Sequence, residues 1–153
     1  MGRAPTLLAA VEKAGGGAFI ADTAPIIYRV ERGADARLVA ACDPLFDAVE
    51  SGALGCLVSA ISVAELLVEP FRVGPTAISA VDAFLRQPSL GIAELDETIA
   101  STAAELVARR QVTRLPDALI AATGVRYGLP IVTGDRRLAR RLGGAALLVA
   151  DYR

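Results

Sequence analysis

Five short apolar runs are spread along the chain and alternate with segments of helical periodicity. Continuous apolar runs are typical of strands that are covered on both faces, as in a parallel sheet. Their alternation with helices predicts a three-layer α/β/α domain with a mostly parallel sheet of about five strands. The predicted strands are 18–21, 56–61, 91–94, 130–133 and 146–149.

Helical patterns fill the intervals between these strands. One such segment has Pro116 near its start and Gly128 directly after its end, which are typical helix boundary residues. Another begins with two acids and ends with two arginines, the arrangement that the helix dipole favours. The predicted helices are 24–31, 35–50, 62–68, 76–86, 96–111, 116–127 and 135–142.

The length of 153 residues fits one domain with a single core. We expect residues 15–153 to form this domain and residues 1–14 to be an N-terminal extension, either an appended helix or a loose tail. Apolar residues make up 54% of the chain, above the usual ~45–50%. The excess suggests an apolar surface for a partner, and the segments 36–49 and 61–71 are candidates for a groove or a dimer contact, or belong to the core.

The sequence gives no sign of a membrane segment. No apolar run approaches the roughly 18–20 residues that a spanning helix needs. The first apolar stretch, residues 7–11, is too short for a signal peptide and is followed at once by Glu12 and Lys13. We therefore expect a cytoplasmic protein.

Composition excludes several kinds of site. The chain has no histidine, and its two cysteines, Cys42 and Cys56, lack the spacing of metal ligands. A Cys/His zinc site is therefore excluded, and so are catalytic triads and acid–base schemes that use histidine. Any chemistry must use carboxylates, hydroxyls or arginines.

Four acids stand at places where chemistry is common, although each also has a local structural explanation. Asp22 follows the first predicted strand and suits a helix N-cap. Glu65 completes a Ser62-x-x-Glu65 capping box. Asp117 lies in the first turn of its helix, where an acid is mildly stabilised, and Asp135 suits the cap of the last helix.

Taken together, the four acids predict a metal site. The carboxyl ends of parallel strands face one edge of the sheet, where ligands bind. Carboxylates that converge there repel one another by ~4 kcal/mol per pair at about 4 Å and an effective dielectric near 20. Cations must neutralise such a cluster if all its members are ionised, and carboxylate oxygens select Mg²⁺ or Mn²⁺.

Arginines are concentrated around two of these acids. Between residues 109 and 141 there are eight arginines against two acids, Asp117 and Asp135, although the whole chain has a net charge of −1. A solvated helix face is the simpler explanation for any one arginine. The clustering favours a surface that binds a phosphate backbone.

The same acids carry a resemblance to a known family. The segments DTAPIIY at 22–28, SVAELL at 62–67, LPDALIAAT at 115–123 and VTGDRRL at 132–138 resemble the successive motifs of PIN-domain proteins. The match is closest to the VapC-type toxins of bacterial toxin–antitoxin pairs and covers residues 18–150. The chain departs from the family at Ala24, where a polar residue is common, and in its longer N-terminal extension.

This resemblance implies a Mg²⁺-dependent endoribonuclease, in which Mn²⁺ can substitute, that is inhibited by a cognate antitoxin and is usually a homodimer. It places the catalytic acids at Asp22, Glu65, Asp117 and Asp135, of which Asp22, Asp117 and Asp135 are the metal ligands. Thr23 and Thr133 are expected to orient carboxylates through their hydroxyls. Contacts to the RNA backbone are assigned to arginines of the basic run, namely Arg109, Arg110, Arg114, Arg136, Arg137 and Arg140.

Two other interpretations stay open. Asp22 at the end of a first strand also suits a phosphatase with an aspartyl nucleophile. Such enzymes usually have a second Asp two residues later, where this chain has Ala24. They also need a lysine near the phosphoryl group, and the sequence contains a single lysine, Lys13. The other interpretation is a catalytically inactive PIN-like module that acts through protein or RNA contacts. The presence of all four acids argues against it, and Mn²⁺ titration would distinguish the two.

Overall fold

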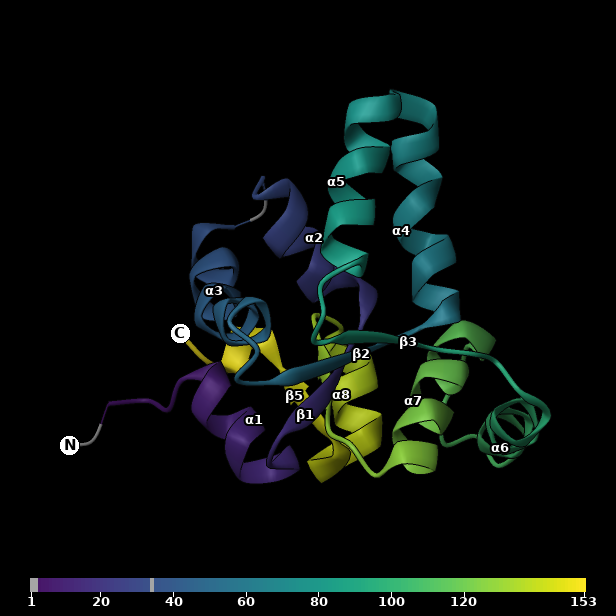
Figure 1. The fold of residues 1–153 in the computed structure, drawn as a ribbon. Coiled ribbons are helices and arrows are strands. Elements are labelled where there is room, and N and C mark those ends of the chain that lie inside the picture. Colours follow the sequence, from purple (N-terminus) through teal and green to yellow (C-terminus); the bar gives the residue numbers. More distant parts are fainter. Residues whose placement is uncertain (1–2, 34) are drawn as a thin grey trace.

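A computed structural model describes residues 3–33 and 35–153 (Figure 1). Within them the chain forms a five-stranded sheet in the order β3-β2-β1-β4-β5, with every neighbouring pair parallel. The predicted strands are correct to within one residue at each end, except that the second ends two residues earlier than predicted. The strands are β1 (Ala18–Ala21), β2 (Gly55–Ser59), β3 (Leu90–Ala93), β4 (Ile131–Thr133) and β5 (Ala146–Leu148).

Helices cover both faces of this sheet. All but one of the seven predicted helices begin within one residue of the predicted position. The helices are α1 (Leu7–Gly15), α2 (Thr23–Glu31), α3 (Ala36–Glu50), α4 (Ala60–Val73), α5 (Pro75–Leu85), α6 (Glu97–Ala108), α7 (Leu115–Tyr127) and α8 (Arg136–Leu142).

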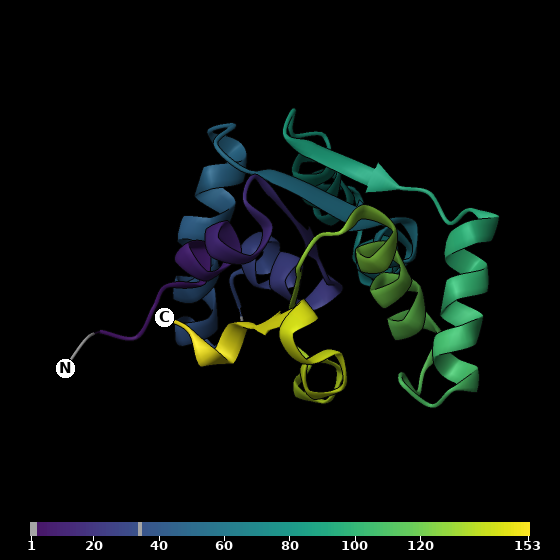
Figure 2. The ribbon, with the colours of Figure 1, turned by 90° about the horizontal axis from the view of Figure 1, so that it is seen from below.

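Side chains of β1 show how the layers are built. Successive residues of a strand point to opposite faces, and Phe19 packs with residues of α1, α2 and α3. Ile20, the next residue, packs instead against Ile120 of α7 and Ile131 of β4. In Figure 2 the green helices α6 and α7 lie together, away from the purple and blue helices α1 to α3. The predicted three-layer α/β/α fold is confirmed.

Helix α4 is longer than predicted. It begins at Ala60 instead of residue 62, because β2 ends at Ser59 and the Ser59 hydroxyl accepts a hydrogen bond from the Ile61 N–H as the N-cap. The helix continues through Pro70 and ends at Val73, followed by the C-cap Gly74, whose φ of 141° suits glycine. Together with α5 it forms an antiparallel hairpin that projects from the body of the molecule (Figure 1).

The N-terminal helix is packed into the core. Leu7 and Val11 of α1 are fully buried and belong to the same apolar cluster as Phe19. The hydroxyl of Thr6 caps the helix by accepting a hydrogen bond from the Ala9 N–H. Most of the segment expected as an extension is therefore integrated in the domain, whereas residues 1–2 lie outside the described part of the chain.

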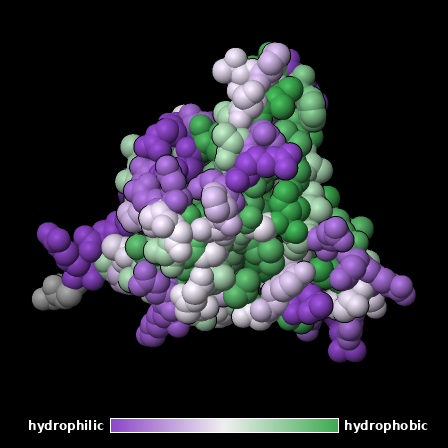
Figure 3. All heavy atoms as spheres, viewed as in Figure 1, coloured by the Kyte–Doolittle hydropathy of each residue, from purple (hydrophilic) through white to green (hydrophobic). Residues whose placement is uncertain are grey.

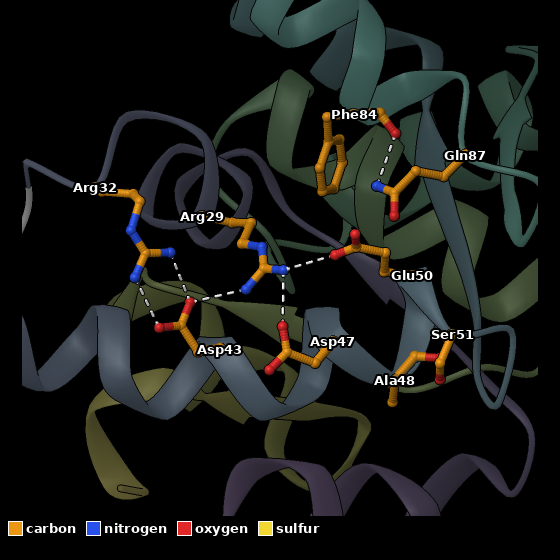
Figure 4. A network of polar contacts seen from close by, with 9 residues as sticks. All are labelled: Arg29, Arg32, Asp43, Asp47, Ala48, Glu50, Ser51, Phe84 and Gln87. Carbon is orange, nitrogen blue, oxygen red and sulfur yellow. Dashed lines mark hydrogen bonds and ion pairs between the residues drawn. The ribbon is translucent and has the colours of Figure 1, made fainter.

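An ion-pair network fixes α2 against α3 (Figure 4). The guanidinium of Arg29 contacts Asp43 at 2.9 Å, Asp47 at 2.8 Å and Glu50 at 3.1 Å, and Arg32 contacts Asp43 at 2.9 Å. The Arg32 guanidinium, and after it that of Arg29, holds the pKa of Asp43 below its usual range. The network holds α2 in place, and Asp22 is the N-cap of this helix. The ion pairs therefore also help to fix the position of Asp22.

The strand order places a switch point beside β1. From β1 the chain moves outward to β2 and β3 on one side, and β4 and β5 lie on the other. Ligands of open α/β sheets bind in the crevice beyond the carboxyl ends of the strands at such a point. None of the helices in the described ranges combines the length and the hydropathy that a membrane-spanning segment needs.

Candidate active site

Asp22 lies at the centre of the site. It follows β1, caps α2 and is 8% exposed. Its Oδ1 accepts a 2.8 Å hydrogen bond from the Thr23 N–H, and its Oδ2 accepts one of 2.7 Å from the Thr133 hydroxyl. Burial raises the pKa of Asp22, the two hydrogen bonds oppose that rise, and the charge of Asp135 adds to it. The side chain is thus a cap and, at the same time, a carboxylate fixed at the sheet edge.

Thr133 connects Asp22 to Asp135. Its hydroxyl is fully buried and, besides donating to Asp22, accepts a 3.0 Å hydrogen bond from the Asp135 N–H. Asp135 caps α8, because its Oδ1 accepts from the N–H groups of Arg137 at 2.8 Å and Leu138 at 3.1 Å. Both capping bonds use Oδ1, so the cap does not engage Oδ2.

Glu65 approaches the same edge from α4. The expected capping box is wrong, since Ser59 is the cap and Glu65 lies in the second turn of the helix. The Thr23 hydroxyl donates a 3.2 Å hydrogen bond to Oε1 of Glu65. Thr23 therefore contacts two predicted site acids, Asp22 through its N–H and Glu65 through its hydroxyl.

Asp117 is the third residue of α7 and directly follows Pro116. Burial raises the pKa of its carboxyl, the charges of Asp22, Asp135 and Glu65 raise it further, and only Arg114 opposes the rise. Asp117 is thus within electrostatic reach of the other three predicted acids, although the four come from four separate segments of the chain.

The donor chemistry of this cluster fits a hard divalent cation, because all its side-chain donors are carboxylate or hydroxyl oxygens. The carboxylates are farther apart than the ligands of a bound metal ion would be. Within residues 3–33 and 35–153, no three His, Cys, Asp or Glu side chains are arranged closely enough to hold a metal ion. A cation at this edge would have to draw the carboxylates together.

A pocket of about 660 Å³ opens beside Asp117 and Asp135. Of the six arginines predicted to bind a phosphate backbone, three line it: Arg114, Arg137 and Arg140. Arg141 lines it as well and was not among the six. It stands four residues after Arg137, and helical spacing would have placed both on one face. Val112, Thr113 and Leu138 complete the wall.

The other three predicted arginines lie elsewhere. Arg109 pairs with Glu105 one turn earlier in α6, at 2.8 Å. Arg110 has a φ of 58°, and its carbonyl oxygen accepts a hydrogen bond from Arg141. Arg136 lines a different hollow, together with Asp151 and Tyr152.

Comparison with known proteins agrees with this architecture. The PIN domain family model matches residues 20–143. Three solved structures share the fold. VapBC2 from Rickettsia felis bound to a promoter DNA fragment has a TM-score of 0.64 and 18% identity, and the match covers 83% of this chain and 94% of that chain. FitAcB from Neisseria gonorrhoeae has a TM-score of 0.64 and 22% identity, with 86% of this chain and 98% of that chain covered. A toxin–antitoxin complex from Klebsiella pneumoniae has a TM-score of 0.63 and 19% identity, with 86% of this chain and 97% of that chain covered. No curated protein matches the chain by sequence.

Proposed function

The chain belongs to the PIN domain family, and on this basis we propose that it is an endoribonuclease that depends on Mg²⁺, with Mn²⁺ as a substitute. One observation carries the proposal: the charges of Asp22, Asp135 and Glu65 all raise the pKa of Asp117, and two of these acids, Asp117 and Asp135, line a pocket with four arginines. Carboxylates that repel one another attract a divalent cation, and arginines attract a phosphate backbone.

The residues divide the work as follows. Asp22, Asp117 and Asp135 would hold the cation, and Glu65 would complete the site through a water or a direct bond. Bound Mg²⁺ supplies an activated water and neutralises charge on the scissile phosphate. Thr133 fixes the direction of the Asp22 carboxylate through its 2.7 Å hydrogen bond. Thr23 does the same for Glu65.

The arginine pocket would hold the RNA strand next to these acids. Arg114, Arg137 and Arg140 line the pocket together with Asp117 and Asp135. Their guanidinium groups suit phosphate oxygens, which they can bind through two parallel hydrogen bonds. Such contacts set the position of the strand without selecting its sequence.

We also propose that the protein is the toxin of a type II toxin–antitoxin pair, with a cognate antitoxin as partner and a homodimer as its assembly. The VapBC2, FitAcB and Klebsiella structures, whose chains share this fold, support the proposal. A further support is the apolar surface of α4, where Val68, Phe71 and Val73 are 51%, 67% and 69% exposed. Figure 3 shows hydrophobic side chains gathered along the α4–α5 hairpin and below it.

A cleavage assay tests the nuclease activity. The purified chain should cut single-stranded RNA with Mg²⁺ present and stop when EDTA is added. Asp117→Asn should abolish the cleavage and keep the fold, because Asp117 makes no capping bond that the amide would lose. Asp82→Asn on α5 is the matched control, since Asp82 is exposed and its one ion pair within the described residues is with Arg86, the C-cap of the same helix. Equal cleavage by Asp117→Asn and the parent would refute the assignment.

The alternative of an inactive PIN-like binding module has one observation in its favour, the absence of a ready three-ligand site among the described residues. Mn²⁺ titration distinguishes the two functions. A nuclease of the proposed kind binds Mn²⁺ in a way that depends on Asp22 and Asp117. An inactive module binds RNA or protein, and its affinity for Mn²⁺ does not respond to these residues.

A further inference from the structure

Gly134 lies between two residues of the proposed metal site, Thr133 and Asp135, and is closely covered by α2. A Cβ atom at this position would lie 2.6 Å from the Tyr28 hydroxyl oxygen and 2.9 Å from the Cβ of Ala24. Real Cβ atoms essentially never show distances under 3.0 Å, so a Cβ here would force Tyr28, Ala24 or the turn to shift. The φ of Gly134 is outside the left-handed region, so the backbone conformation itself would allow alanine. Glycine is needed here for room alone.

The surface that covers Gly134 is rigidly held. Ala24 and Tyr28 are four residues apart and therefore lie on one face of α2. At its start the helix is fixed by the Asp22 cap, and near its end Arg29 pairs with three acids of α3. A turn that packs against this face has little freedom to move.

The turn is also tied on both sides of the glycine. Before it, the Thr133 hydroxyl donates to Asp22, and after it, the Asp135 N–H donates back to that hydroxyl at 3.0 Å. A shift of the backbone at Gly134 therefore moves the Asp135 carboxylate and the donor that orients Asp22. Both are proposed to act on the same cation.

We propose that Tyr28 and Ala24 are positioning residues of the metal site, which set the distance between the Asp22 and Asp135 carboxylates by packing against Gly134. This proposal rests on the proposed metal-dependent function. It also gives a reason for the alanine at position 24, where the family often has a polar residue. The Cβ of Ala24 lies 2.9 Å from the place that a Cβ on Gly134 would take, so this side chain faces the turn.

Gly134→Ala tests the contact, with Gly144→Ala as the matched control. A Cβ at Gly144 meets no atom within 4 Å, and its φ is likewise outside the left-handed region. Gly134→Ala should weaken Mn²⁺ binding, followed by electron paramagnetic resonance of the free ion, by about tenfold or more. It should lower kcat for RNA by about 100-fold with little change in KM, because the catalytic groups are displaced. Gly144→Ala should behave like the parent.

A second background separates positioning from a general defect in folding. Ala24→Gly with Tyr28→Phe removes the two atoms that the new Cβ would approach more closely than 3.0 Å, and leaves the ring Cζ of residue 28 at 3.4 Å, an ordinary contact. In this background, adding Gly134→Ala should cost less than about threefold in Mn²⁺ affinity, since the clash is gone. Circular dichroism identifies a Gly134→Ala protein that does not fold, and restored folding and Mn²⁺ affinity in the relieved background then support the proposal.

Three results would overturn it. One is a Gly134→Ala protein that binds Mn²⁺ as tightly as the parent. Another is an equal loss of affinity in both backgrounds. The third is a relieved background that fails to restore a misfolded Gly134→Ala protein. A parent that binds no Mn²⁺ and cleaves no RNA would instead refute the proposed function, and the positioning role with it.

Discussion

The Thr133 hydroxyl donates a 2.7 Å hydrogen bond to Oδ2 of Asp22 and so joins the ends of β4 and β1, 111 residues apart in the chain. Both groups are buried at the switch point of the sheet. The same hydroxyl accepts from the Asp135 N–H. The Thr133 hydroxyl thus orients the Asp22 carboxylate and holds the backbone of Asp135, two acids of the candidate site.

Thr133→Val should lower the free energy of unfolding by about 1–3 kcal/mol, because it leaves a buried acceptor and the Asp135 N–H without their partner. Burial already raises the pKa of Asp22 in the folded state, so its ionised form destabilises the fold. The destabilisation by the ionised Asp22 carboxylate is absent below the unfolded-state pKa of Asp22 and complete above its folded-state pKa. The loss caused by Thr133→Val should therefore be larger at pH 7 than at pH 3 in urea unfolding. Thr133→Ser keeps the hydroxyl and is the control, and an equal loss at both pH values would contradict the account.

Asp117→Asn should stabilise the protein in the absence of divalent cations. Burial and the charges of Asp22, Asp135 and Glu65 raise the pKa of Asp117, so ionisation of this half-buried carboxyl opposes folding at neutral pH. The gain should be at most about 1 kcal/mol, because solvent screens a partly exposed charge. It should be present at pH 7 and vanish below the unfolded-state pKa. Thermal unfolding in EDTA measures it, and a lower midpoint for Asp117→Asn at pH 7 would show that Asp117 has a structural role instead.

Much of the fold is predictable because its signals are local. Continuous apolar runs mark buried parallel strands, and caps such as Asp135 mark helix starts. The site acids follow from the shared edge of a parallel sheet. The second strand shows the limit of this reasoning: its apolar run continues to Ile61, but the strand ends at Ser59. The two-residue error moved the helix start and made Ser62 look like a cap.

The arginine pocket could be predicted only in part. The sequence alone does not distinguish adjacent arginines such as Arg136 and Arg137. Which surface each of them faces depends on how α8 packs against α7. Arg137 lines the pocket beside Asp117 and Asp135, whereas Arg136 lines another hollow, together with Tyr152. Packing also determines that α1 is buried. No local sequence signal distinguishes a buried N-terminal helix from an appended one.

Ser59 and Ser62 should respond in opposite ways to alanine. Ser59→Ala removes the cap of α4 and should cost about 0.5–2 kcal/mol of stability. The Ser62 hydroxyl is buried and has no hydrogen-bond partner within the described residues. Ser62→Ala should therefore be neutral or stabilise by up to about 1 kcal/mol. Urea unfolding of both variants measures the difference, and a larger loss from Ser62→Ala would restore the capping box.

Arg137 and Arg136 form a matched pair that tests the proposed RNA-binding surface. Arg137→Gln should raise KM for RNA and reduce the slope of log affinity against log salt by about 1, the change expected for one lost phosphate contact. Arg136→Gln should change both quantities less, because Arg136 lines another hollow. Binding of a short single-stranded RNA at several salt concentrations provides the slopes. Equal slopes for Arg137→Gln and the parent would remove the pocket from the substrate path.

Single-turnover cleavage of an end-labelled RNA by the parent and by Asp22→Asn, each with Mg²⁺ and with EDTA, tests the proposed four-acid metal centre most directly. Asparagine still caps a helix, so the fold should survive. The parent should cleave only with Mg²⁺, and Asp22→Asn should be slower by at least about 100-fold, because a lost metal contact removes several kcal/mol and each ~1.4 kcal/mol is a factor of ten. Cleavage that persists in EDTA, or that Asp22→Asn leaves unchanged, would contradict a metal centre built on Asp22.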